Sequence, residues 1–181
     1  IVYLNLGDLL LKYGDDPLQI KDERPVRKKE NQFWTPIHIA ADKCYPDILK
    51  SLLDNSPNPS IPNNSLVTPL HLAASRKDQE VIDILLKSNA DVEAKDIDGD
   101  PPLFRAIESR LMKNIEKLTN EHTVNISNKE GKTALHLSSI LGYQEIVSFL
   151  ISKGSNVSKC DNEGNSPLHY AVSKGHTECV R

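Results

Sequence analysis

The sequence predicts an all-α solenoid, in which short helix–turn–helix units stack side by side and extended loops join them. A six-residue phrase recurs five times along the 181 residues, at steps of 33, 33, 32 and 33 residues. Apolar residues follow each copy at helical spacing. A pair of helices this short cannot bury its apolar face alone, so neighbouring units have to stack. The five copies occupy residues 35–40, 68–73, 101–106, 133–138 and 166–171.

The fourth copy shows the expected order of elements most clearly. A first helix should begin after Thr133, a good N-cap residue, and end at Gly142, which suits a left-handed C-terminal turn. A second helix is expected over residues 145–151 and should end at Gly154. Residues 156–164 then form a loop that ends in a turn. Each unit is therefore predicted to be helix, turn, helix and extended loop.

The same reading divides the whole chain into units. Four full units are expected, of which the third is degenerate, together with partial units at both ends and one inserted loop. The chain begins without Met and inside a unit, so it is predicted to be a piece of a longer polypeptide. The predicted divisions are 1–22 (partial unit), 23–32 (inserted loop), 33–65, 66–98, 99–130 (degenerate), 131–163 and 164–181 (truncated).

The repeated phrase, T-P-L-H-x-A with a period of about 33, resembles the signature of the ankyrin-repeat family. The resemblance covers roughly residues 31–181. It implies loops that project as β-turn fingers, first helices that line a concave groove, and second helices that form the convex back. It also implies that the finger tips and the groove bind a partner protein. The recurring histidines, His38, His71, His136 and His169, are then structural, joining one repeat to the next by hydrogen bonds to backbone.

Composition favours a binding module over an enzyme. The net charge of −3 gives no reason to expect binding to nucleic acid, and no run approaches the roughly 20 apolar residues of a membrane span. No motif for a catalytic site, cofactor or metal is present. Stacked helices lie roughly 8–10 Å apart, too far for the four histidines to share one zinc ion. The three scattered cysteines are typical of reduced thiols. We therefore expect an intracellular, cytoplasmic, monomeric module without cofactor.

The resemblance also predicts which residues face a partner. They flank each finger tip or end each first helix. Trp34 has two interpretations, a binding hot spot or a side chain packed under the inserted loop. Ile140 and Leu141 are apolar at exposed-type positions, although Ile140 can equally pack inward. The predicted contact residues are Trp34, Asp42, Lys43, Arg76, Asp98, Asp100, Lys129, Lys132, Ile140, Leu141, Asn162 and Asn165.

Two departures from the repeat pattern have open interpretations. Residues 24–29 form a basic cluster that is either a partner-specific loop or import signal, or a solvated insertion balanced by nearby acids. In the third unit, Phe104 replaces the expected histidine, one residue is missing, and the second helix around residues 114–118 is short and polar. This unit is a hinge, a binding feature or the result of drift. The favoured interpretation is sequence drift with low local stability, so the array should unfold there first.

The predicted function is that of a scaffold or adaptor that binds a partner protein through the concave face and finger tips. The alternative is a regulatory segment of a larger enzyme or of an ankyrin-bearing cation channel. What lies beyond the two ends of the chain would decide between them.

Overall fold

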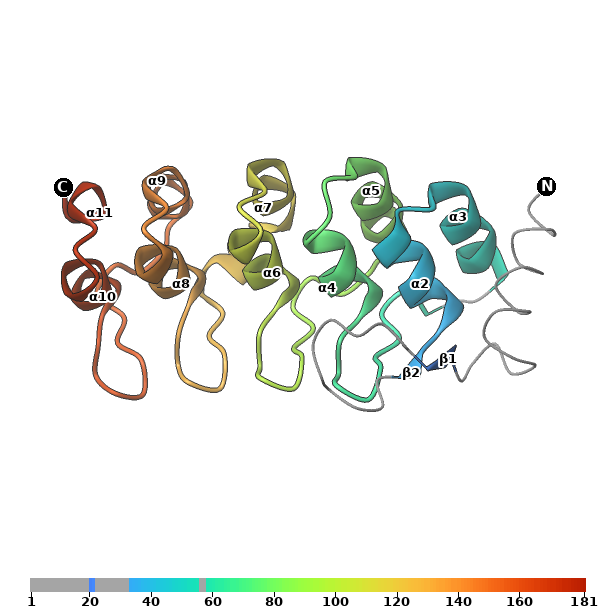
Figure 1. Cartoon of the computed structure of the whole chain (residues 1–181), viewed down its shortest axis with the longest axis horizontal. Helices are drawn as coiled ribbons and strands as arrows, with labels where there is room; N and C mark the ends of the chain where they lie inside the picture. Colours follow the sequence, from blue (N-terminus) through green and yellow to red (C-terminus); the bar gives the residue numbers. More distant parts are fainter. Residues whose placement is uncertain (1–19, 22–32, 56–57) are drawn as a thin grey trace.

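The computed structural model describes residues 20–21, 33–55 and 58–181, and Figure 1 shows its arrangement. The predictions of a partial unit at 1–22, an inserted loop at 23–32 and a basic cluster at 24–29 lie outside the described residues, apart from Ile20 and Lys21. These two residues form β1 (Ile20–Lys21), which pairs antiparallel with β2 (Phe33–Trp34). Because this ladder is only two residues long, it does not alter the fold class, and the expected all-α class is confirmed.

The helices come in consecutive pairs, and each pair lies inside one predicted unit. In Figure 1 the first helices of the pairs form one row beside the projecting loops, and the second helices form a parallel row farther from them. The boundaries of the units themselves stay predictions. The helices are α2 (Pro36–Lys43), α3 (Pro46–Asn55), α4 (Pro69–Ala74), α5 (Gln79–Lys87), α6 (Pro102–Glu108), α7 (Met112–Leu118), α8 (Ala134–Leu141), α9 (Gln144–Ser152), α10 (Pro167–Ser173) and α11 (Thr177–Val180), with a 3₁₀ turn at Thr123–Asn125.

The repeated phrase starts each first helix because its residues satisfy the free N–H groups there. Thr133 is the N-cap of α8 in extended conformation, and the ring of His136, three residues later, reaches back to it. In α2, α4 and α10 a proline also occupies the first turn, where its missing N–H costs nothing. As predicted, Gly142 ends α8 with a φ of 71°.

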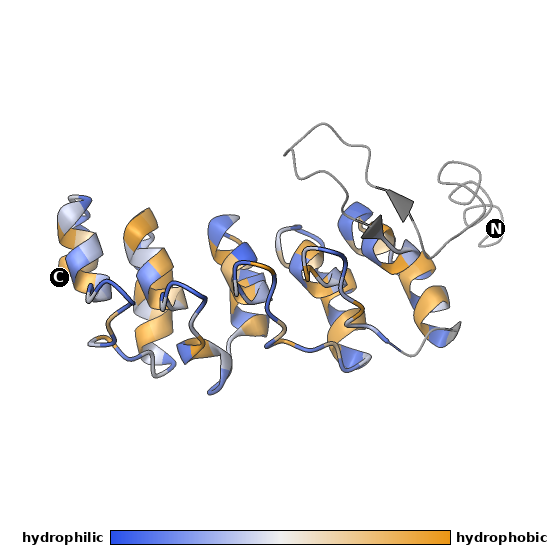
Figure 2. Ribbon diagram, turned by 90° about the horizontal axis from the view of Figure 1, so that it is seen from below, coloured by the Kyte–Doolittle hydropathy of each residue, from blue (hydrophilic) through white to orange (hydrophobic). Residues whose placement is uncertain are grey.

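The hydrophobic core is continuous along the array and is not gathered around one central point. Each first helix packs against the first helix of the next unit, from α2 to α10. The leucine of the repeated phrase lies between them, and Leu70, Leu103 and Leu135 are fully buried or nearly so. Figure 2 shows apolar residues concentrated on the helices and hydrophilic residues along the loops. Burying one leucine contributes roughly 1.5–3 kcal/mol, so the repeated stacking stabilises every interior unit.

The second helix of the third unit is short, as predicted, but it is not a polar helix. α7 has seven residues, against nine in α5 and α9. Ile115 and Leu118 are buried in the common core. Asn114 is also fully buried and donates hydrogen bonds to the carbonyls of Ala74 and Arg76, at 3.0 and 2.7 Å. The polar residue that weakened the sequence pattern therefore links this unit to the preceding one.

Candidate functional site

The loops between the units fold into fingers of one kind. Each finger starts with an asparagine or aspartate whose Oδ1 accepts the backbone N–H groups two and four residues later. In the 96–100 finger, Asp96 accepts from Asp98 and Asp100, both at 3.0 Å. The N–H of Asp96 also donates to the carbonyl of Asp100 at 3.1 Å. One side chain thus fixes a five-residue turn. The other fingers are residues 63–67, 128–132 and 161–165.

Histidines of the repeated phrase join three of the four fingers to the preceding unit. The Nε2 atoms of His38, His71 and His136 lie 3.0, 2.9 and 3.1 Å from the carbonyl oxygens of Val67, Asp100 and Asn165. Burial lowers the pKa of His38 to about 4 and also lowers the pKa values of His71 and His136. Neutral rings with Nε2–H as donor fit these contacts. The structural role that the resemblance implied is therefore present at these three positions.

The fingers are also bonded directly to one another. The N–H of Ile97 donates to the carbonyl of Ser65 at 2.9 Å, and the N–H of Lys129 donates to the carbonyl of Asp98 at 3.2 Å. Asn162 makes the equivalent bond to Glu130 at 3.0 Å. These backbone bonds recur at each step of the array. They hold the fingers in a fixed row, so side chains on neighbouring tips have a defined spacing.

A pocket of about 370 Å³ lies between the 96–100 finger and the 128–132 finger. This size is at the lower end of the range for ligand pockets, roughly 300–1,000 Å³. Its walls come from both fingers and its base from the first helices α6 and α8. We call it the finger pocket, and its lining residues are Asp98, Asp100, Phe104, Asn128, Lys129, Glu130, Lys132, Leu137 and Ile140.

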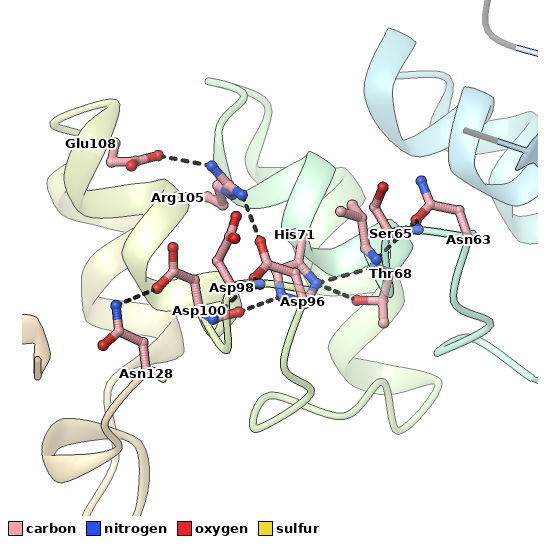
Figure 3. A network of polar contacts seen from close by, with 11 residues as sticks. Asn63, Ser65, Thr68, His71, Asp96, Asp98, Asp100, Arg105, Glu108 and Asn128 are labelled. Carbon is pink, nitrogen blue, oxygen red and sulfur yellow. Dashed lines mark hydrogen bonds and ion pairs between the residues drawn. The ribbon is translucent and has the colours of Figure 1, made fainter. Parts of the chain in front are cut away.

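The 96–100 side of the finger pocket is acidic, and Figure 3 shows its polar network. Arg105 forms ion pairs with Asp96 at 2.6 Å and with Glu108 at 3.2 Å. The carboxylate of Asp100 accepts a hydrogen bond from the amide of Asn128 at 2.9 Å, which bridges the two fingers. Burial raises the pKa of Asp100, and the nearby charge of Asp96 adds to this effect.

The 128–132 side is basic but partly neutralised. Lys132 forms an ion pair with Glu130 at 2.7 Å, and its Nζ lies 5.4 Å from the centre of the Tyr170 ring. The hydrogen bond to Glu130 raises the pKa of Lys132. Lys129 is exposed at the tip. Opposite charges therefore face each other across the pocket, above an apolar base.

Five of the predicted contact residues line this pocket together: Asp98, Asp100, Lys129, Lys132 and Ile140. They come from two fingers and one helix of neighbouring units. Whether they contact a partner stays a prediction, but the structure brings them together around one pocket.

Two predicted contact residues are corrected by the structure. Trp34 is only 6% exposed, because it packs with Ile39 and Leu72 and stacks on the ring of His38. Asp42 is 4% exposed, because it forms an ion pair with Arg76. Both side chains are buried in contacts between units and offer little surface to a partner.

The remaining predicted contacts do not line the pocket. Lys43 is exposed at the end of α2, and Arg76 is half-buried beside Asp42. Leu141 packs against the main core. Asn162 bonds the carbonyl of Lys129 at 2.8 Å, and the carbonyl of Asn165 is the acceptor for His136. These five residues are spread over the array rather than gathered in a site.

Phe104, Asn128 and Leu137 line the pocket but were not among the predicted contacts. Phe104 is 2% exposed at the position where other units carry the linking histidine. Asn128 had a signal in the sequence, since asparagine or aspartate recurs at positions 63, 96, 128 and 161. Leu137 looked like an ordinary core position, and only the three-dimensional arrangement shows that it reaches the pocket.

In the part of the chain that the structure describes, no group of three histidine, cysteine or acidic side chains is arranged to hold a metal ion. None of the helices described there is both long and apolar enough to cross a bilayer.

Comparison with known proteins adds a family assignment. Residues 3–96 and 103–181 match the sequence profile described as ankyrin repeats (3 copies). The chain is 32% identical over 139 residues to neurogenic locus notch homolog protein 1 of Xenopus tropicalis, covering 76% of this chain and 6% of that protein. It is 30% identical over 156 residues to the B-cell lymphoma 3 protein homolog of Mus musculus, covering 81% of this chain and 34% of that protein.

A third relative matches almost the whole chain. A transient receptor potential cation channel subfamily A member 1 homolog of Caenorhabditis elegans is 26% identical over 180 residues, or 99% of this chain and 14% of that protein. The chain thus spans only a small part of the length of these relatives. Ankyrin repeats are generally protein-interaction modules without catalytic activity. The repeated phrase, the stacked helix pairs, the row of fingers and the profile match together show that this chain belongs to the ankyrin-repeat family.

Proposed function

We propose that this array binds a partner protein through the face formed by its fingers and first helices, with the finger pocket at the centre of the contact. The observation that carries the proposal is the pocket itself. Its charged rims and apolar base come from neighbouring units, and backbone hydrogen bonds between the fingers fix their positions. A preformed surface loses little conformational entropy when a partner binds, which favours affinity.

The proposal can be tested with two charge-swapped variants that leave the net charge unchanged. In the first, Asp98→Lys and Lys129→Glu exchange the charges on the two exposed tips of the pocket. In the second, Lys113→Glu and Glu145→Lys exchange two exposed charges on α7 and α9, in the row of second helices. Each immobilised protein is incubated with the same cell lysate, and the captured proteins are quantified by mass spectrometry.

A partner of the concave face should be captured by the original chain and by the Lys113/Glu145 variant. We expect its capture to fall about tenfold with the Asp98/Lys129 variant, because like charges would then face each other across the interface. Circular dichroism should show that both variants keep their helices. Equal capture by all three folded proteins would reject the finger pocket as the binding surface.

A second possibility is that the array is a regulatory segment of a larger channel protein. The match to the cation channel homolog, which extends over 99% of this chain, favours it. The coding sequence on both sides of these 181 residues tests this possibility directly. Membrane-spanning segments following the array would support it, whereas a full-length product without such segments would reject it.

A further inference from the structure

The acidic side of the finger pocket has a carboxylate that its neighbours do not neutralise. Asp100 is half-buried, and it receives one hydrogen bond from the neutral amide of Asn128. The guanidinium of Arg105 is already shared between Asp96 and Glu108. Among the residues that the structure describes, no cation forms an ion pair with Asp100. Burial raises the pKa of Asp100 and the charge of Arg105 acts to lower it, but the ion pairs of Arg105 are made to the other two carboxylates. A partly desolvated carboxylate without an ion-pair partner is a favourable place for an incoming positive charge.

The basic side of the pocket is a weaker place for a ligand charge. Lys132 is held by Glu130 and by the face of the Tyr170 ring. Lys129 is exposed, and ion pairs between exposed groups contribute little because water screens them. An acidic ligand would therefore gain less at this wall than a basic ligand would gain at Asp100.

The base of the pocket is suited to an alkyl chain. Leu137 and Ile140 of α8 are half-buried, and Phe104 of α6 closes the base between the two fingers. Arginine and lysine side chains carry a charge at the end of an apolar stem, and they can bury the stem while the charge is paired. The pocket volume of about 370 Å³ leaves room for one such side chain.

We infer that the finger pocket binds an arginine or lysine side chain of the partner protein. The charged head pairs with Asp100, and the alkyl stem packs on Leu137 and Ile140. This inference rests on the proposed function, and it adds the chemistry of the residue that the partner inserts.

The inference can be tested without knowing the partner, by NMR titration of the 181-residue chain labelled with ¹⁵N. The probe is N-acetyl-arginine amide, with N-acetyl-citrulline amide as an uncharged control of the same shape and N-acetyl-glutamate amide as the acidic alternative. For arginine we expect a dissociation constant on the order of 1 mM, with shifts in the amides of residues 96–104 and 128–140. Citrulline should bind about tenfold more weakly.

The variant Asp100→Asn keeps the size of the side chain and removes its charge. It should weaken arginine binding about tenfold, while the matched variant Asp91→Asn, on an exposed loop residue, should leave binding unchanged. Arginine shifts elsewhere on the array, equal binding of citrulline, stronger binding of glutamate, or unchanged arginine binding by the folded Asp100→Asn variant would each overturn the inference.

These outcomes can be separated from a failure of the proposed function. Lysate capture that depends on Asp98 and Lys129, together with no arginine binding, would keep the proposed function and reject the basic side chain. Arginine binding at the pocket without any pocket-dependent capture would keep the site for a basic side chain and reject the pocket as the surface that binds a partner protein.

Discussion

The linking histidines show how one residue can serve both local and long-range structure. The Nδ1 of His38 accepts from the N–H of Thr35 at 3.2 Å and lies 2.8 Å from its hydroxyl, while Nε2 bonds the carbonyl of Val67 in the next unit. These contacts require an unprotonated Nδ1. Adding a proton there would place two donors against each other in a buried site, so the folded state strongly favours the neutral ring.

The stability of the array should therefore fall as the pH is lowered through the range in which unfolded histidines gain protons. Because the pKa of His38 is about 4 in the folded state and 6.5 in the unfolded state, only the unfolded chain binds a proton between these values. The contribution is complete above pH 6.5 and is lost progressively toward pH 4. From pH 7.5 to pH 5, His38 alone should cost about 2 kcal/mol of unfolding free energy, measured by urea denaturation.

The lowered pKa values of His71 and His136 should add to this loss in the same direction. A His38→Gln variant should show a smaller change between the two pH values, whatever its absolute stability. Replacement of the exposed His122 by Gln should leave the pH dependence as it is in the original chain. An unfolding free energy that does not change between pH 7.5 and pH 5 would contradict the role assigned to these rings.

At the scale of elements, α7 shows that a short helix can be secured by one buried polar side chain. The amide nitrogen of Asn114 donates to two carbonyls at the end of α4, and its oxygen accepts from Gln79 at 2.9 Å. Ala74 is the last residue of α4 and Arg76 follows it, and the helix has only six residues and few bonds of its own. Asn114 thus ties a short α7 to a short α4.

Replacing Asn114 by alanine should destabilise the array by about 2–3 kcal/mol, because buried carbonyl groups would lose their donor. The measurement is the change in unfolding free energy in urea. Lys113→Ala, on the exposed side of the same helix, is the matched control and should stay within about 0.5 kcal/mol of the original chain. If both variants were equally stable, the bonds made by Asn114 would have no net effect and α7 would be held by Ile115 and Leu118 alone.

At the scale of the whole molecule, the sequence predicted the architecture well because the repeat imposes it. The N-cap threonines, the leucine or isoleucine two residues after each and glycines such as Gly142 recur at fixed spacing, and each has a local physical role that fixes the next element. No local sequence signal of this kind indicates which side chains pack against a neighbouring unit. Asp42 was expected to face a partner, and Trp34 was left open between a binding hot spot and a packed side chain. Both are buried, against Arg76 and Leu72, which lie more than 30 residues away in sequence.

The finger pocket was predictable only in part for the same reason. Its charged residues occupy finger positions that the repeat pattern identifies, so Asp98, Asp100, Lys129 and Lys132 could be selected one by one. That they line one pocket depends also on Phe104 and Leu137, and the sequence context of these two residues indicates only core positions. The sequence also did not show which of the four charges would be neutralised by a neighbour.

The junction between the third and fourth units should be the weakest interior link of the array. The other interior junctions have a histidine bonded to the next finger, but Phe104 cannot make this bond, and the Lys132 carbonyl accepts from Asn128 of its own finger. Within these 181 residues, two helix pairs lie beyond this junction. In the last pair, Leu168 and Val172 are 52% and 61% exposed. In a linear array, stability depends on contacts between nearest neighbours.

We therefore expect the array to lose its structure in two stages as urea is added. Amides of α8 and α9 should lose protection from hydrogen exchange at a lower urea concentration than amides of α4 and α5, since the block from α8 to α11 is smaller and coupled through the junction without a histidine. Hydrogen exchange followed by mass spectrometry resolves the two regions. Simultaneous loss of protection in both regions would mean that the Asp100–Asn128 bond and the Lys129–Asp98 backbone bond couple the blocks as firmly as a histidine does.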